Sequence, residues 1–289
     1  MKIYKCSASN EPSIKKRLIE NGALFPNVFF NEDELLNIIL KTFPDPDNSI
    51  ITLPLCNTLI AEVFDADIDY GDKIMDPYIK SYRYNNLYDI PKKIDSLYTD
   101  RILTALNITR KLSDKGYIVS FNIDGPFTIL GSLIDPIKLF KSFKKNPKLL
   151  KSIIDFLSSV IIEFGNKVIE SNASIISYSD SSGTIDLIGP RLFNEFCTEP
   201  NLKIIKSFRS QIENKKSIIH ICGKSTYGLY STDKIEIIPH MTKESKYRDA
   251  LLKIIDENKI KIIGNSCLGK INLKPFNSEI FEIIIKDSK

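Results

Sequence analysis

The chain has 289 residues and nearly balanced charge, with 40 Lys and Arg against 36 Asp and Glu. This length suits one α/β barrel and is sufficient to bury a full core. The basic residues are dispersed along the chain. Their two densest groups are at 15–17 and 144–148, and we interpret these as a solvated lysine-rich surface rather than a nucleic-acid site. No segment has the apolar core of a signal peptide or the roughly 20 apolar residues that span a bilayer. We therefore expect a cytoplasmic protein without a membrane or nucleic-acid partner.

Apolar periodicity and turn residues predict helices and strands that alternate from about residue 50 to the end. Ahead of them, Asn31 followed by Glu34 predicts the capped start of a helix that Pro44 ends. The predicted strands are 50–56, 117–123, 173–178, 218–222, 235–239 and 260–263. The other predicted helices are 13–21, 58–64, 91–114, 136–144, 146–171, 190–213, 243–257 and 278–286.

Short apolar strands between long helices predict a parallel sheet covered by helices. Ionisable residues recur at the predicted strand ends, where the active-site face of a barrel lies. An open doubly wound sheet would also bind its ligand there, but no glycine-rich dinucleotide loop follows the first strand. We therefore predict a TIM (β/α)8-type barrel as a single domain over 1–289, with 1–48 as an N-terminal helical extension and 49–289 as the barrel.

His220 and Cys222 end one predicted strand, and side chains two apart on a strand point to the same side. Imidazole and thiolate together suit zinc, and the chain has only two histidines. The structural alternative is a buried histidine beside a small apolar cysteine, which the residues alone favour. Cys267, at the end of the last predicted barrel strand, is by itself as typical of a core filler.

Three further acidic residues and the second histidine are candidates with equally ordinary alternatives. Asp124 and Asp180 follow strands and can line a cavity, or they cap the next helix or form a turn. Glu62, early in a helix, can contact the site or be an ordinary first-turn carboxylate. His240 also follows a strand and is a possible fourth ligand or acid–base group, or a satisfied polar residue.

The five cysteines are odd in number and widely scattered, which does not indicate a disulfide framework. Three of them have no ligand partner at a useful spacing, and we assign them no function. They are Cys6, Cys56 and Cys197.

Four stretches carry a resemblance to a known family: 53–62, 124–130, 178–193 and 220–223. They resemble the uroporphyrinogen decarboxylase superfamily over roughly 25–270, and within it the methylcobalamin:thiol (coenzyme M type) methyltransferases of corrinoid systems. His220-Ile221-Cys222-Gly223 is similar to the first half of that group's His-x-Cys…Cys zinc signature, which makes Cys267 the third ligand. The interval from Cys222 to Cys267 is short, so we expect one strand–helix unit to be shortened or missing. The decarboxylase's arginine-rich N-terminal motif has no counterpart here.

The resemblance implies a methyltransferase that moves a methyl group from methylcobalamin, carried transiently on a partner corrinoid protein, to a small thiol or related acceptor. It implies Zn²⁺ on His220, Cys222 and Cys267, where the metal would lower the pKa of the acceptor thiol. Asp180 and Glu62 are the predicted catalytic residues, and Asp124 with Asp180 the predicted corrinoid contacts. Two alternatives stay open: a metal-free uroporphyrinogen decarboxylase-like lyase acting on a tetrapyrrole, and a non-catalytic corrinoid-binding barrel.

Overall fold

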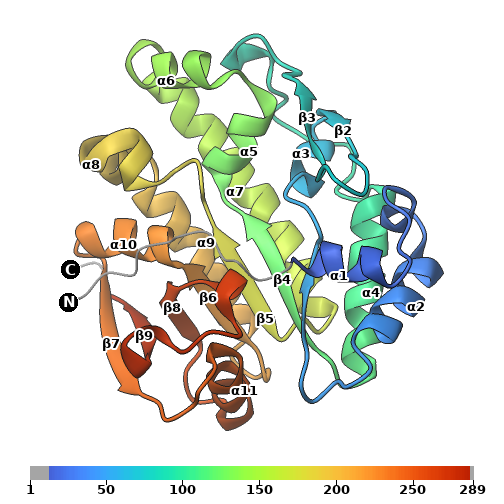
Figure 1. The fold of residues 1–289 in the computed structure, drawn as a ribbon. Coiled ribbons are helices and arrows are strands. Elements are labelled where there is room, and N and C mark those ends of the chain that lie inside the picture. Colours follow the sequence, from blue (N-terminus) through green and yellow to red (C-terminus); the bar gives the residue numbers. More distant parts are fainter. Residues whose placement is uncertain (1–12, 287–289) are drawn as a thin grey trace.

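The structure is a computed structural model that describes residues 13–286, and it is built on a seven-stranded sheet (Figure 1). The strands of this sheet, in spatial order, are β1 (Ile50–Leu53), β4 (Ile118–Asp124), β5 (Ile175–Ser179), β6 (Ile218–Cys222), β8 (Ile262–Ser266), β9 (Glu279–Ile285) and β7 (Ile235–Met241). A separate two-stranded ribbon consists of β2 (Asp67–Asp69) and β3 (Tyr78–Ser81).

Five strands, β1, β4, β5, β6 and β8, are parallel neighbours in chain order, as in a barrel. The predicted α/β class is therefore confirmed. The sheet does not close, because β1 and β7 are its two edges. Strand β6 pairs directly with β8, while β7 lies beyond the antiparallel strand β9. The departure from a regular eightfold barrel thus lies in the short C-terminal region where the sequence indicates it.

Helices cover the outer face of the sheet, with the long helix α7 behind β4 and β5 in Figure 1. The helices are α1 (Ile14–Glu20), α2 (Glu32–Thr42), α3 (Leu59–Glu62), α4 (Asp100–Asp114), α5 (Pro126–Leu133), α6 (Pro136–Lys145), α7 (Pro147–Glu170), α8 (Ile185–Phe196), α9 (Thr198–Gln211), α10 (Gly223–Ser231) and α11 (Tyr247–Glu257). Short 3₁₀ turns are η1 (Asn27–Phe29), η2 (Leu87–Asp89), η3 (Leu268–Lys270) and η4 (Phe276–Ser278). The predicted cap of α2 is confirmed, since the Asn31 side chain accepts a hydrogen bond from Glu34 N. None of the helices within 13–286 is long and apolar enough to cross a membrane.

Several predicted helices differ from the structure. The last one, 278–286, is wrong: β-branched isoleucines of β9 pair antiparallel with β7 and β8, and burial of Ile280 and Ile283 decides for the strand. The helix predicted from residue 91 begins only at Asp100, where the Thr99 hydroxyl accepts from Ile102 N. The helix predicted over 190–213 is two helices, α8 and α9, and the chain kinks inside α8 at Gly189. Helices α5 and α10, which follow strands at once, were not predicted.

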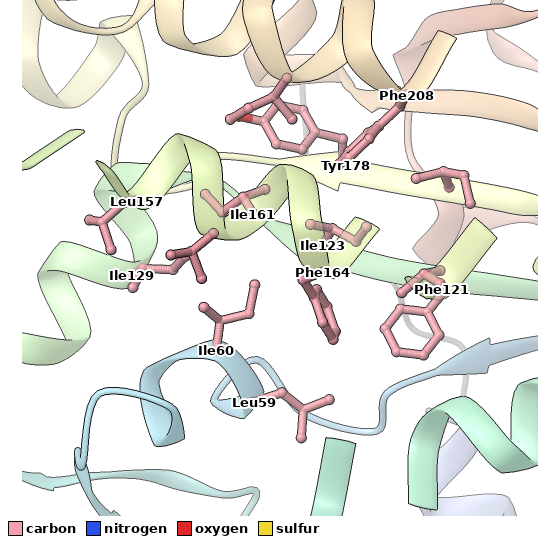
Figure 2. Packing of buried hydrophobic residues seen from close by; sticks show 14 of the residues in the cluster. Leu59, Ile60, Phe121, Ile123, Ile129, Leu157, Ile161, Phe164, Tyr178 and Phe208 are labelled. Atoms are coloured by element: carbon pink, nitrogen blue, oxygen red, sulfur yellow. The ribbon is translucent and has the colours of Figure 1, made fainter. Parts of the chain in front are cut away.

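The core lies between the sheet and its covering helices. Figure 2 shows Phe121 and Ile123 of β4 facing Phe164 of α7, with the rings of Phe121 and Phe164 5.8 Å apart in an edge-to-face contact. On the neighbouring strand, Tyr178 meets Phe208 of α9 in the same geometry. These contacts hold in place the strands whose carboxyl ends line the candidate site described below.

The close packing of α7 on α9 depends on a glycine. A Cβ added at Gly165 would lie 2.1 Å from Cε1 of the buried Phe208 ring. We therefore expect Gly165→Ala to lower the free energy of unfolding by about 1–3 kcal/mol, because the ring must move in a packed core. Urea unfolding measures this. Gly131→Ala in α5 is the control, since its Cβ would meet nothing closer than 3.5 Å; an equal loss in both variants would contradict the packing argument.

Candidate active site

A cavity of about 720 Å³ opens at the carboxyl ends of the parallel strands. Alternate residues of three neighbouring strands line it: Asn122 and Asp124 of β4, Ser177 and Ser179 of β5, His220 and Cys222 of β6. Strand register places Asn122, Ser177 and His220 side by side in one layer. Asp124 and Ser179 stand paired in the next layer. This layering is what a barrel interior requires, and it makes one wall of the cavity polar and mostly uncharged.

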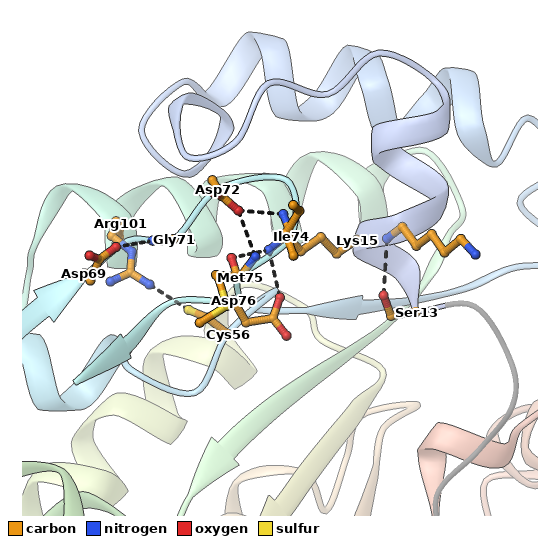
Figure 3. A network of polar contacts seen from close by, with 11 residues as sticks. Ser13, Lys15, Cys56, Asp69, Gly71, Asp72, Ile74, Met75, Asp76 and Arg101 are labelled. Carbon is orange, nitrogen blue, oxygen red and sulfur yellow. Dashed lines mark hydrogen bonds and ion pairs between the residues drawn. The ribbon is translucent and has the colours of Figure 1, made fainter. Parts of the chain in front are cut away.

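The other walls come from β1, from α1 and from the segment after β8. Among the described residues that line the cavity, the lysines and arginines are Lys15 and Arg17, both on α1. The Lys15 ammonium donates to the Met75 carbonyl at 2.6 Å and to Asp76 at 2.9 Å, next to the Asp72–Asp76 turn drawn in Figure 3. The Arg17 guanidinium lies 4.2 Å from the centre of the Phe43 ring. Among the described lining residues, the lysine and arginine charges therefore lie on the α1 side of the cavity.

His220 is buried, with 1% of its surface exposed. Its Nε2 lies 3.1 Å from the Tyr247 hydroxyl at the start of α11. Burial lowers the pKa of His220 to about 4. The imidazole is therefore neutral at physiological pH, which is the form that binds a metal ion.

Cys222 ends β6, and Cys267 directly follows the adjacent strand β8. Both thiols and His220 line the same cavity, and this donor set suits zinc. The three side chains are not drawn together as a preformed site: within residues 13–286, no group of three or more His, Cys, Asp or Glu side chains is arranged to hold a metal ion. The structure thus brings the predicted ligands to one cavity without assembling them.

His240 lies elsewhere. It is on the exposed part of β7, with Nε2 2.8 Å from a carboxylate oxygen of Glu282 on β9, and it does not line the cavity. The structure does not bring it together with His220.

Asp180 does not line the cavity, because its carboxylate is turned into the protein. It accepts hydrogen bonds from Phe127 N at 3.2 Å, Thr128 N at 2.8 Å and the Thr128 hydroxyl at 2.9 Å, at the start of α5. Burial raises the pKa of Asp180. A Cβ at Gly125 would lie 2.4 Å from the Asp180 Cβ, so glycine is needed where β4 passes into α5. Asp180 therefore holds the start of α5 against the end of β5.

Asp124 is the carboxylate that lines the cavity. The pKa of Asp124 is raised to about 7, mainly by burial and secondly by the charge of Asp180. A carboxyl group with that pKa can hold or release a proton near neutral pH, which is the property of a general acid or base.

Glu62 ends α3 outside the lining of this cavity and pairs with Arg101, Nη1 to Oε2 at 3.4 Å. It also accepts from the hydroxyls of Tyr70 and Thr99. The Arg101 side chain is buried and donates through Nη2 to Cys56 Sγ at 2.7 Å (Figure 3). The structure therefore separates Glu62 from His220 and Cys222.

Sequence reasoning missed Arg101 and the polar cavity wall. A single arginine in an amphipathic helix gives no signal of burial. The sequence did contain a signal for the polar wall, since polar residues recur at every second position of β4 and β5. Of the cysteines without an assigned function, Cys197 is buried in the core, Cys56 lines the cavity and Cys6 lies outside the described residues.

The family model "Uroporphyrinogen decarboxylase (URO-D)" matches residues 14–265. The methylcobamide:CoM methyltransferase MtaA of Methanosarcina barkeri is 25% identical over 227 residues, which are 77% of this chain and 65% of the relative. The methylcobamide:CoM methyltransferase MtbA of Methanosarcina mazei is 24% identical, covering 74% of this chain and 63% of the relative. A uroporphyrinogen decarboxylase of Wolbachia sp. subsp. Brugia malayi is 25% identical, covering 68% and 56%.

A solved structure, a methyltransferase from Methanosarcina mazei, superposes with a TM-score of 0.64 at 23% identity, covering 78% of this chain and 66% of that one. This similarity shows the fold. The chain spans less than two-thirds of the length of each of the three sequence relatives.

Proposed function

The chain belongs to the uroporphyrinogen decarboxylase (URO-D) family, and on that basis we propose that it is a corrinoid-dependent methyltransferase. It would move a methyl group from methylcobalamin, delivered by a partner corrinoid protein, to a thiol or related acceptor. The named relatives MtaA and MtbA, methylcobamide:CoM methyltransferases, support the reaction class. The cytoplasmic location predicted from the sequence stays a prediction.

The composition of the cavity wall is the observation that carries this proposal. A neutral imidazole and two thiols stand on a wall of serine, asparagine and a carboxyl group with a raised pKa. The rim of a cobalamin ring carries neutral amides, which such groups can hydrogen-bond. The tetrapyrrole substrate of a decarboxylase carries carboxylates and would need paired cations, whereas here one of the two lining cations, Lys15, is already paired with Asp76. The lining therefore favours the corrinoid.

We propose His220, Cys222 and Cys267 as ligands of Zn²⁺, which requires the two thiols to move toward the imidazole. When bound, zinc would supply Lewis acidity that lowers the pKa of an acceptor thiol. The chain's own contribution is a neutral imidazole, two thiols and a cavity shielded by α1. His220 and Cys222 are on strand β6, which is a rigid support, and Cys267 directly follows the adjacent strand β8.

The acidic residues take different roles in this proposal. Asp124 contacts the bound donor or acceptor and can take up the proton that the acceptor thiol releases. Asp180 is a positioning residue that holds α5 beside Asp124. Glu62 stays a predicted catalytic residue, and its pairing with Arg101 means that it would act only through movement of that pair.

The reaction is tested with free methylcobalamin and a small thiol. Transfer breaks the cobalt–carbon bond and forms a sulfur–carbon bond, and it changes the corrin absorbance, which gives the rate. We expect purified protein to hold about one zinc per chain, to lose transfer when a strong chelator removes it and to regain transfer when zinc is returned. Transfer that persists in metal-free protein would remove zinc from the proposal. No transfer, with cobalamin bound, would favour the non-catalytic alternative.

A further inference from the structure

The outer face of α6 combines exposed apolar side chains with lysines. Leu139 and Phe143 of this helix are buried, whereas Ile137 is 65% and Phe140 is 44% exposed. The residues that we call the α6 patch are Ile137, Phe140, Lys141, Lys144, Lys145 and Lys148. Tyr88, 71% exposed, adjoins the patch, because its hydroxyl lies 3.4 Å from Asn146 Oδ1 between α6 and α7.

The four lysines of the patch carry uncompensated charge. Nearby basic side chains do find partners: Lys151 pairs with Glu195, and Lys138 donates to Asn85. None of the four patch lysines forms an ion pair within the part of the chain that the structure describes. Four like charges beside two exposed apolar groups repel one another, and an opposite charge on a partner relieves that repulsion.

The patch stands at the same end of the molecule as the cavity. Asp124 ends β4, α5 begins two residues later, and α6 follows α5 after Ile134 and Asp135. Figure 1 shows α6 beyond α5, at the end toward which β4 points. A protein that presents a bound methyl group to the cavity must approach this end.

We propose that the α6 patch is the docking surface for the corrinoid-carrying partner, and that the partner meets it with an acidic surface. This inference rests on the proposed function. The lysines steer the partner, and Ile137 and Phe140 form the apolar contact that orients it over the cavity. An anionic membrane is the less favoured occupant, because the other apolar side chains of α6 are buried in the fold and only two remain for insertion.

The test compares two double charge reversals. Lys141→Glu with Lys144→Glu alters the patch, and Lys203→Glu with Lys206→Glu alters two exposed lysines of α9 that likewise form no ion pair within residues 13–286. Each variant transfers methyl groups to the same thiol from two donors: free methylcobalamin, and the methylated cobalamin-carrying protein purified from the source cells by its corrin absorbance. Both are assayed at low and high salt, about 20 and 300 mM.

We expect the patch variant to raise KM for the protein-bound donor about tenfold at low salt, less at high salt, and to leave KM for free methylcobalamin unchanged. The α9 variant should match the unaltered protein with both donors. Equal effects of the two variants, no effect of either, or no cobalamin-carrying protein that serves as donor would overturn the docking surface. Binding to anionic vesicles that only the patch variant loses, with protein-bound transfer intact, would assign the patch to a membrane. If free methylcobalamin itself gives no transfer, the proposed function fails first.

Discussion

Replacing Cys222 by serine is expected to remove bound zinc and to lower methyl transfer from free methylcobalamin at least about a hundredfold. A serine hydroxyl is a poor zinc ligand at neutral pH compared with a thiolate, so two of the three proposed donors would remain. The substitution is small, and Cys222 is partly exposed at the end of β6, so the fold should persist. Zinc content by metal analysis and transfer by corrin absorbance are measured on the same preparation.

The same substitution at Cys56 is the matched control. Cys56 lines the same cavity but is supplied by the chain after β1 and receives a hydrogen bond from Arg101, which a serine oxygen can also accept. Cys56→Ser should therefore keep both zinc and transfer. If Cys222→Ser retains its zinc, or if the two variants lose it equally, the assignment of Cys222 as a zinc ligand is wrong.

The strand ends could be predicted from the sequence because local patterns determine them. Buried parallel strands are short apolar runs, and the register of β4, β5 and β6 then brings Asp124, His220 and their neighbours to one end. The direction in which a side chain points was harder to predict from the sequence. Asp124 is the last residue of β4, pairs with Ser179 and lines the cavity. Asp180 comes one residue after Ser179 and turns back to α5, where Gly125 leaves room for its side chain.

Long-range pairing explains most of what the sequence did not indicate. The Ile-rich segment at β9 fits helical and strand periodicity alike, and only its position between β7 and β8 makes it a strand. Glu62 pairs with a buried arginine 39 positions away in the sequence, and no local pattern indicates that pairing. The role that we propose for the lysines in 141–148 could not be predicted either, because charge becomes informative only once the partners of each lysine are known.

Asp124→Asn is expected to stabilise the protein above pH 7 while impairing its function. The pKa of Asp124 is raised from 3.8 to about 7 by burial and by Asp180. Between about pH 4 and pH 7 the folded state therefore holds a proton that the unfolded state has released, so the free energy of unfolding falls as the pH rises through this window and stays low above it. Asparagine does not ionise, so it removes both this loss of stability and the electrostatic repulsion from Asp180. At pH 8 the free energy of unfolding of Asp124→Asn should exceed that of the parent by on the order of 2–4 kcal/mol, and this difference should vanish near pH 4.

Urea unfolding at about pH 4, 6 and 8 measures the difference in the free energy of unfolding between variant and parent. Asp155→Asn, at an exposed position of α7, is the control and should follow the parent at every pH. A constant offset between Asp124→Asn and the parent would show that Asp124 ionises normally in the folded protein. A gain in stability that appears only as the pH rises, joined to slower transfer, would mean that the chain retains a destabilising carboxyl group in its cavity for the reaction.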